Sequence, residues 1–355
     1  MDLETPLLKI IRGEKKAPFI MAGLASLSVI YRSLIGLRNW AYDKGVLPST
    51  QLSVPVVSIG NIAVGGTGKT PLVHLLALKL QDKARVAILT RGFRSKIEKS
   101  GQIQQISSGS GPLCSSQECG DEPFLLAQKT KTSIWVGADR IASGQQAILQ
   151  GANCLVLDDG MQHRRLKRDF EIVVVDGNDP FFKGRFVPYG LLRDSPKRLR
   201  NANLIVATRV KDEEHYHQLK KQIAHYSAAP LVATQVDVLK KQAIQPSKVG
   251  VFCGIGQPSQ FLQTARDLKS EIVDTLILKD HGSLKEGQLQ TFAESCRQKG
   301  AEALLCTEKD VVKLSSDFSV CLPIIPVEIQ LKIIAGKEHW ENLIENILAK
   351  VTHER

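Results

Sequence analysis

The chain has 355 residues, of which 43% are hydrophobic and 23% are charged, as is ordinary for a globular protein of this size. The formal net charge of +11 points to anionic partners, and by itself does not choose among nucleic acid, phospholipid headgroups and phosphorylated substrates. The seven cysteines form neither a CxxC pair nor a Cys/His zinc spacing, which argues against a disulfide framework and favours buried thiols in a reducing cytosol.

An apolar segment flanked by cations lies near the N-terminus. It carries no charge from Ala17 to Tyr31, and its apolar character continues to Leu37. The uninterrupted part is shorter than the ~20 residues that span a bilayer. Flanking lysines and arginines, with Trp40 and Tyr42 near the end, are typical of a helix that lies in the headgroup interface. A buried core helix and a true span are the alternatives, and no secretory signal peptide is recognisable.

Beyond residue 45, short β-branched runs alternate with helical stretches, which indicates an α/β fold. Strands are expected at Val54–Ile59, Arg85–Thr90, Cys154–Leu157, Ile172–Val175, Leu204–Ala207, Val249–Cys253, Ile272–Leu278 and Ala303–Thr307. Helices are expected at Pro71–Leu80, Pro258–Leu268, Leu284–Lys299 and His339–Lys350. Because the strands of the first half are almost continuously apolar, helices should cover both faces of a largely parallel sheet. We predict an N-terminal membrane-associated segment (1–45), a core (46–229) and a smaller C-terminal α/β unit (230–355).

The strongest motif is a glycine-rich turn placed between the first predicted strand and the first predicted helix of the core. The turn consists of Ala63, Val64, Gly65, Gly66, Thr67, Gly68, Lys69 and Thr70. In this context backbone N–H groups surround phosphate oxygens at a helix N-terminus, which predicts a P-loop NTPase-type fold and ATP binding. We expect Lys69 to reach the terminal phosphates and the Thr70 hydroxyl to bind Mg²⁺. Ala63 departs mildly from the usual initial glycine, and a chance glycine-rich loop is the alternative.

An acidic pair follows another buried strand. Asp158 and Asp159 come directly after the apolar run Cys154–Leu157. The carboxyl edge of an open α/β sheet is where such folds bind ligands, so either carboxylate could hold Mg²⁺ directly or through water. The alternative is a simple turn opened by Asp-Asp-Gly.

Seven motifs occur in the order of one known family. They are Ser58–Pro71, Thr90–Phe93, Gly120–Pro123, Leu157–His163, Pro188–Arg193, Asp280–His281 and Thr307–Asp310. Over nearly the whole chain this set resembles the tetraacyldisaccharide 4'-kinases of lipid A synthesis. The resemblance implies transfer of the ATP γ-phosphate to the 4'-hydroxyl of a tetraacylated glucosamine disaccharide 1-phosphate, giving lipid IVA. It also implies a monotopic enzyme on the cytoplasmic face of a bacterial inner membrane. Met161 and Tyr189 depart from the family pattern, and we expect both to affect packing or substrate fit.

The resemblance also implies roles for single residues. The family's Asp–His dyad falls on Asp121 and His281, with Asp121 as the base that deprotonates the sugar hydroxyl. A helix N-cap at Asp121 and a structural role for His281 are the alternatives. Glu122 is a further candidate for holding Mg²⁺. From its place after a strand, independently of the resemblance, Arg91 is expected to meet a phosphate or the acceptor, with simple solvation as the alternative. His163 is expected to orient a phosphate or a carboxylate of the substrate site, with a surface histidine beside Arg164 and Arg165 as the alternative.

The stretch from His163 to Arg200 is rich in cations with interleaved aromatic residues. This composition suits RNA stacking, a phosphorylated and acylated sugar at a membrane, or a solvated face. The apolar N-terminal segment favours the lipid substrate, and we expect no nucleic-acid partner. Arg193 is our candidate for stabilising the charge of the transition state. Thr307–Asp310 resembles the base-reading element of GTP-binding proteins, and its place near the nucleotide or between domains stays open. A GTPase switch, a partitioning-type ATPase and a soluble-metabolite kinase are competing functions, although the partitioning-type signature lysine would fall at Val64.

Overall fold

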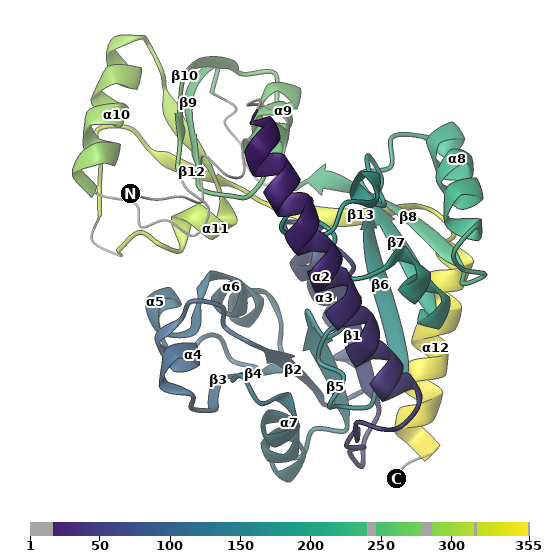
Figure 1. The fold of residues 1–355 in the computed structure, drawn as a ribbon. Helices are drawn as coiled ribbons and strands as arrows, with labels where there is room; N and C mark the ends of the chain where they lie inside the picture. The colour runs from purple at the N-terminus through teal and green to yellow at the C-terminus, as the bar shows by residue number, and fades with distance from the viewer. Residues whose placement is uncertain (1–16, 240–245, 279–285, 316–317, 354–355) are drawn as a thin grey trace. The chain divides into compact units, whose positions relative to one another are not determined.

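The computed structural model describes residues 17–239, 246–278, 286–315 and 318–353, and these form an α/β fold (Figure 1). Its internal contacts define two units. Unit 1 contains the described residues up to Leu89, Arg140–Gln235 and the residues from Lys332 onward, and unit 2 contains Thr90–Asp139 and Val236–Leu331. The predicted division into an N-terminal segment (1–45), a core (46–229) and a smaller C-terminal unit (230–355) stays a prediction.

Within the described residues, one sheet has nine strands in the order β13-β8-β7-β6-β1-β5-β2-β4-β3. Their bounds are β1 Val56–Asn61, β2 Val86–Thr90, β3 Gln104–Ser108, β4 Ser133–Val136, β5 Cys154–Asp158, β6 Phe170–Asp176, β7 Leu204–Thr208, β8 Leu231–Val238 and β13 Ile329–Ala335. The neighbours from β2 through β5, β1, β6 and β7 to β8 pair in parallel, and β3 pairs antiparallel with β4. The predicted fold class is confirmed, and each predicted strand lies within two residues of its observed bounds.

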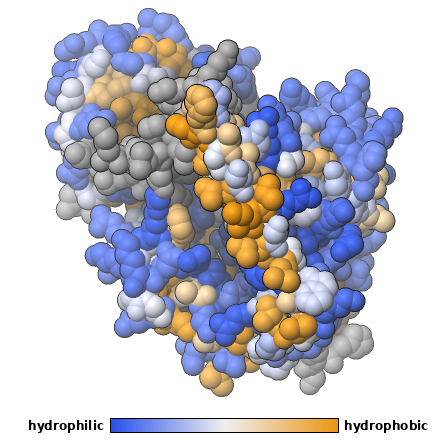
Figure 2. Space-filling view, in the orientation of Figure 1, coloured by the Kyte–Doolittle hydropathy of each residue, from blue (hydrophilic) through white to orange (hydrophobic). Residues whose placement is uncertain are grey.

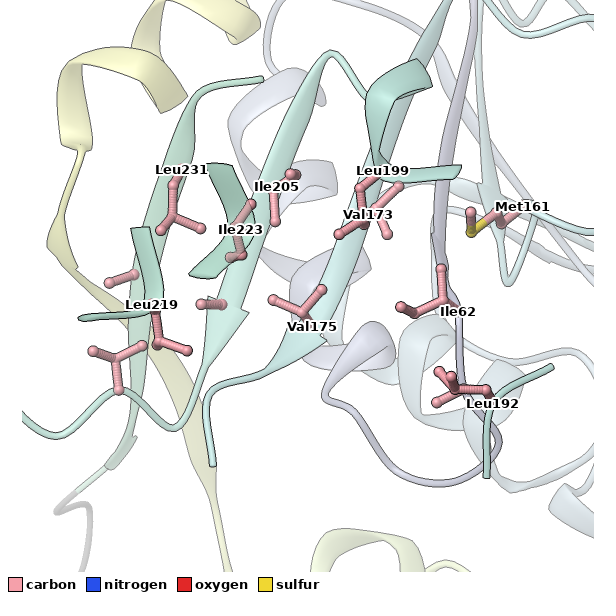
Figure 3. Close-up of a cluster of buried hydrophobic side chains, with 14 of the residues drawn as sticks. Ile62, Met161, Val173, Val175, Leu192, Leu199, Ile205, Leu219, Ile223 and Leu231 are labelled. Carbon is pink, nitrogen blue, oxygen red and sulfur yellow. The ribbon is translucent and has the colours of Figure 1, made fainter. Parts of the chain in front are cut away.

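Helices cover both faces of the sheet in unit 1, as the apolar strands predict. Their bounds are α3 Lys69–Leu80, α7 Arg140–Leu149, α8 Glu213–Ala224 and α12 Lys337–His353, with 3-10 turns η1 Phe182–Gly184 and η2 Pro196–Asn201. α3 packs against β1, β5 and α12, and α12 also contacts β7. On the other face Leu219 and Ile223 of α8 pack with Val173 and Ile205 in a buried cluster (Figure 3). Met161, for which we expected a role in packing or substrate fit, lies in this cluster and is 4% exposed.

Unit 2 contains a second, parallel sheet in the order β10-β9-β11-β12. Its elements are β9 Lys248–Cys253, α9 Pro258–Asp267, β10 Glu271–Ile277, α10 Glu286–Gln298, β11 Ala303–Thr307, α11 Glu308–Val311 and β12 Ile324–Val327. Alternate residues of β9 face opposite sides, so Val251 packs with Phe261 of α9 while Phe252 packs with Leu289 of α10. The remaining helices of unit 2 are α4 Lys96–Ser100, α5 Ser116–Cys119 and α6 Asp121–Lys129.

The apolar N-terminal segment forms α2, a helix of 26 residues from Pro18 to Asp43. Only Ser28 and Asn39 are buried in it, so the structure does not have the buried core helix that was one alternative. Its large exposed side chains are Phe19, Ile20, Leu27, Val29, Ile30, Leu34, Leu37 and Trp40. Figure 2 shows an orange strip of apolar surface along the helix. By length and composition alone, α2 could cross a membrane.

Polar contacts fix the other side of α2 to unit 1. Ser28 Oγ donates to the carbonyl of Phe186 at 3.0 Å, and Tyr31 donates through its hydroxyl to the carbonyl of Arg193 at 3.1 Å. Asn39 Nδ2 donates to the Asp194 carboxylate at 2.9 Å. At the end of the helix, the Asp43 carboxylate binds the guanidinium groups of Arg164 and Arg198. The helix is therefore held by hydrogen bonds while its apolar side chains face outward.

Candidate active site

The glycine-rich turn of unit 1 connects the end of β1 to the first residue of α3. Gly68 caps the helix at φ +89°, and a Cβ there would lie 2.9 Å from the Thr208 methyl group. Only glycine fits this position without strain. The Thr67 hydroxyl accepts a hydrogen bond from Asn61 Nδ2 at 2.6 Å, and its carbonyl accepts one from Thr208 Oγ1 at 3.0 Å. Residues at the ends of β1 and β7 thus set the shape of the turn.

The acidic pair reaches this turn from the end of β5. Asp158 is the last residue of the strand and is 4% exposed, whereas Asp159 follows it at φ +54°. Lys69 Nζ lies 3.7 Å from Asp159 Oδ1, and Arg193 Nη1 donates to Asp159 Oδ2 at 3.0 Å. Three of the residues predicted for phosphate chemistry, Lys69, Asp159 and Arg193, therefore form one cluster in unit 1.

The electrostatics of the cluster keep Asp159 ionised. Partial loss of water around this carboxyl would by itself raise its pKa. The positive charges of Lys69 and then Arg193 outweigh that effect and lower the pKa to about 2. The side chain is still 38% exposed. An ionised carboxylate beside the P-loop lysine is thus open to a metal ion or a polar ligand.

Backbone pairing delivers Arg193 to the cluster. Leu192 forms an antiparallel bridge with Ala63, and Arg193 N donates to the carbonyl of Ile62 at 2.9 Å. The guanidinium also contacts Asn61 at the end of β1. Because this strand-like pairing fixes the backbone, Arg193 can hold its charge beside the phosphate turn without reorganisation.

Sequence reasoning missed four residues of this edge: Asn61, Asp176, Thr208 and Arg209. Arg209 stands at φ +62°, binds the Asp176 carboxylate and donates to the carbonyl of Gly66 in the turn. Burial lowers the pKa of the Arg209 guanidinium, and Asp176 opposes that shift. A signal was present, because Asn61, Asp176 and Thr208 each end an apolar run, and the carboxyl ends of parallel strands meet at one edge.

The other candidate carboxylates belong to unit 2. Asp121 and Glu122 open α6, and Gly120 occupies the N-cap at φ +96°, so Asp121 does not have the capping role considered as an alternative. Asp121 Oδ2 lies 3.7 Å from Lys313 Nζ, and Glu122 forms an ion pair with Lys309. This part of the chain places a carboxylate beside a lysine in the first turn of a helix.

Three predicted site residues remain: Arg91, His163 and His281. Arg91 follows β2 in unit 2, is 62% exposed, and its Nε lies 2.5 Å from Glu98 Oε1. His163 lies in the turn after the acidic pair, where its N–H donates to the carbonyl of Gly160 at 2.9 Å. His281 lies outside the described residues.

The donors near the phosphate turn fit Mg²⁺ better than a transition metal. Among the residues that the structure describes, no three His, Cys, Asp or Glu side chains gather as a metal site. Mg²⁺ needs fewer protein ligands, since it is usually bound by one or two carboxylates, water and substrate phosphates. The exposed Asp159 carboxylate and the Thr70 hydroxyl at the start of α3 are oxygen donors of that kind.

Comparison with known proteins gives consistent matches along the chain. Residues 20–349 match the family model described as tetraacyldisaccharide-1-P 4'-kinase. A tetraacyldisaccharide 4'-kinase of Syntrophus aciditrophicus is 34% identical over 93% of each chain. One from Geobacter sulfurreducens is 34% identical over 91% of this chain and 94% of its own. The crystal structure of LpxK from Aquifex aeolicus in complex with ATP covers 93% of this chain and 99% of its own, with a TM-score of 0.74 and 29% identity.

Proposed function

This chain belongs to the family of tetraacyldisaccharide 4'-kinases and is an ATP-dependent kinase of lipid A biosynthesis, and from that premise we propose its acceptor, its site residues and its location. The acceptor is the 4'-hydroxyl of a tetraacylated glucosamine disaccharide 1-phosphate, and the product is lipid IVA. The observation that carries the site assignment is the cluster of Lys69, Asp159 and Arg193 beside the phosphate-binding turn.

In this proposal unit 1 binds the triphosphate. Backbone N–H groups of the turn from Ala63 to Thr70 surround the phosphate oxygens, and Lys69 neutralises the terminal phosphates. Arg193 stabilises charge on the phosphoryl group as it is transferred, because its guanidinium is already fixed beside the turn. In phosphoryl transfer the protein contributes mainly by positioning the reacting groups and neutralising charge.

The proposal includes Mg²⁺, which would neutralise phosphate charge when bound. Thr70 and Asp159 are its first candidates for ligands, with Asp158 acting through water and Glu122 as a further carboxylate. Lys69 and Arg193 keep Asp159 ionised, and an ionised oxygen donor is what a hard cation needs.

Asp121 of unit 2 is the proposed general base for the sugar hydroxyl. A carboxylate is a weak base in water, so it must be oriented to accept the proton as the phosphorus–oxygen bond forms. Its place in the first turn of α6 and the Lys313 ammonium beside it restrict its orientation. His281 as its partner, and Arg91 and His163 as substrate-binding residues, complete the proposed set.

The transfer reaction itself is the direct test. Radiolabelled ATP and the disaccharide 1-phosphate in mixed micelles should give a labelled lipid, and hydrolysis should place the label at the 4' position. The reaction should fail without micelles, whereas a kinase of a soluble metabolite would be indifferent to them. GTP supporting transfer better than ATP would contradict the nucleotide assignment.

We also propose that α2 lies on the cytoplasmic face of the inner membrane and holds the enzyme where the lipid acceptor is found. Its exposed apolar face and the chain's charge of +11 suit an anionic lipid surface. Leu34→Glu should lower partitioning onto anionic vesicles by at least about tenfold, since burying a leucine contributes ~1.5–3 kcal/mol. Leu149→Glu is the matched control, because Leu149 is 79% exposed on α7. Equal losses in both variants would contradict this location.

A further inference from the structure

The Thr307–Asp310 motif has a structural place in unit 2 that a base-reading role would not allow. The Asp310 side chain is 1% exposed. One of its oxygens accepts from the N–H of Gly254 at 3.0 Å and from Lys313 Nζ at 3.1 Å, and the other accepts from the Thr307 hydroxyl at 2.5 Å. A carboxylate that reads guanine must face the base, and this one faces the protein interior.

The same short element contacts α6 along its length. Glu308 forms an ion pair with Lys129 in the last turn of α6, and Lys309 forms one with Glu122 in the first turn. Lys313, just beyond α11, lies between Asp310 and Asp121. The element therefore contacts the helix at both ends, and Lys313 beyond it contacts Asp121 in the first turn.

The contact to Asp121 differs from an ordinary surface ion pair. Both side chains are shielded, with 12% of Lys313 and 16% of Asp121 exposed, so solvent screens their attraction less than at the surface. The buried Asp310 fixes the lysine in turn, and the turn after β9 fixes Asp310. A chain of contacts thus runs from the sheet of unit 2 to one carboxylate oxygen.

We infer that Lys313, held by Asp310, is a positioning residue that orients the Asp121 carboxylate for phosphoryl transfer. The inference rests on the proposed role of Asp121 as the base. A carboxylate that rotates away from the acceptor hydroxyl loses proton-transfer geometry, and a misplacement of about 1 Å costs on the order of a hundredfold in rate. The Asp310 carboxylate of the Thr307–Asp310 motif then serves turnover through Lys313 and Asp121.

The test compares Lys313→Met with Lys129→Met, which breaks the ion pair at the far end of α6. We expect Lys313→Met to lower kcat about 10- to 100-fold with the KM for ATP within about threefold of the original. Lys129→Met should leave kcat within about twofold, and Lys313→Arg should restore most of the loss. Equal effects of Lys313→Met and Lys129→Met, or no effect of Lys313→Met on kcat, would overturn the inference.

A double-mutant cycle separates this inference from the function on which it rests. If Lys313 acts through Asp121, Lys313→Met should have no further effect on kcat in an Asp121→Asn background. An undiminished further loss there would refute the positioning role, and full activity of Asp121→Asn alone would refute the base assignment. If Lys313→Met does not fold, Asp310→Asn takes its place with the same expected selective loss in kcat.

Discussion

In the glycine-rich turn of unit 1, backbone conformation and the ends of adjacent strands determine the geometry, whereas the two carboxylates in the first turn of α6 contact lysines from a distant part of the chain. Gly68 at φ +89° and the Thr67 contacts to β1 and β7 shape the turn. Glu122 instead meets Lys309 from 187 positions further along the chain. A site made from a contiguous turn tolerates little local change, and a site made from distant pairs depends on the packing of a whole unit.

The largest effect is expected from a substitution in the glycine-rich turn of unit 1. Lys69→Ala should lower kcat/KM by roughly a thousandfold or more while the fold persists, because it removes the charge beside the phosphates. Lys79→Ala, at an exposed position on the same helix, is the matched control and should leave the rate unchanged. Activity of the Lys69 variant within a few-fold of the original would contradict the phosphate site.

The next effect should fall on turnover alone. Asp121→Asn should lower kcat by roughly 10²- to 10⁴-fold, the range for loss of a general base, and leave ATP affinity unchanged. Steady-state kinetics together with ATP titration measure the two quantities separately. Equal losses in both would point to a structural role for this residue of α6.

Two glycines of the turn test how far backbone conformation determines its stability. Gly68→Ala should lower the free energy of unfolding by about 1–2 kcal/mol, because alanine is strained at positive φ and its methyl group would approach Thr208. Gly66→Ala is the control, since no atom lies within 4 Å of a Cβ there. Urea unfolding curves of the two variants should therefore separate, and coinciding curves would show that the turn relaxes freely.

The smallest effect concerns pH. The pKa of Asp159 is lowered to about 2, so its ion pairs stabilise the fold above the ordinary carboxyl pKa and are lost as pH falls from about 4 to 2. Because the side chain is 38% exposed, solvent screening limits this contribution to about 0.5–1 kcal/mol. Asp159→Asn should remove that part of the acid-induced loss in unfolding free energy. An identical pH dependence in the variant would contradict the contribution.

The comparison also explains what the sequence could predict. The glycine turn, Lys69 and the acidic pair follow strand and helix signals that are local, and Asp159 does lie beside Lys69. The contacts of Asn61 and Arg209 depend on strand order, which apolar runs do not specify. The pairing of Lys313 with Asp121 depends on packing between distant segments, and no local pattern signals it.

The helix α2 shows the same limit on what the sequence can predict. Its flanking cations favoured the membrane interface, but burial in protein stayed an alternative, because lipid and protein interiors both exclude water. The outward direction of Leu34 and Leu37 is a property of tertiary packing, in which the buried Ser28 and Asn39 contact Phe186 and Asp194. The sequence could predict the segment but not which of its sides meets the protein.

The hydrogen bonds of α2 give the proposed membrane location a geometric consequence. Tyr31 and Asn39 bind residues 193 and 194, and the backbone of Arg193 pairs with the strand that enters the phosphate turn. The depth of α2 in the lipid therefore also sets the distance of the Arg193 guanidinium from the membrane surface. That distance fixes how far the sugar of the lipid acceptor must extend from the membrane before its 4'-hydroxyl reaches the γ-phosphate of ATP.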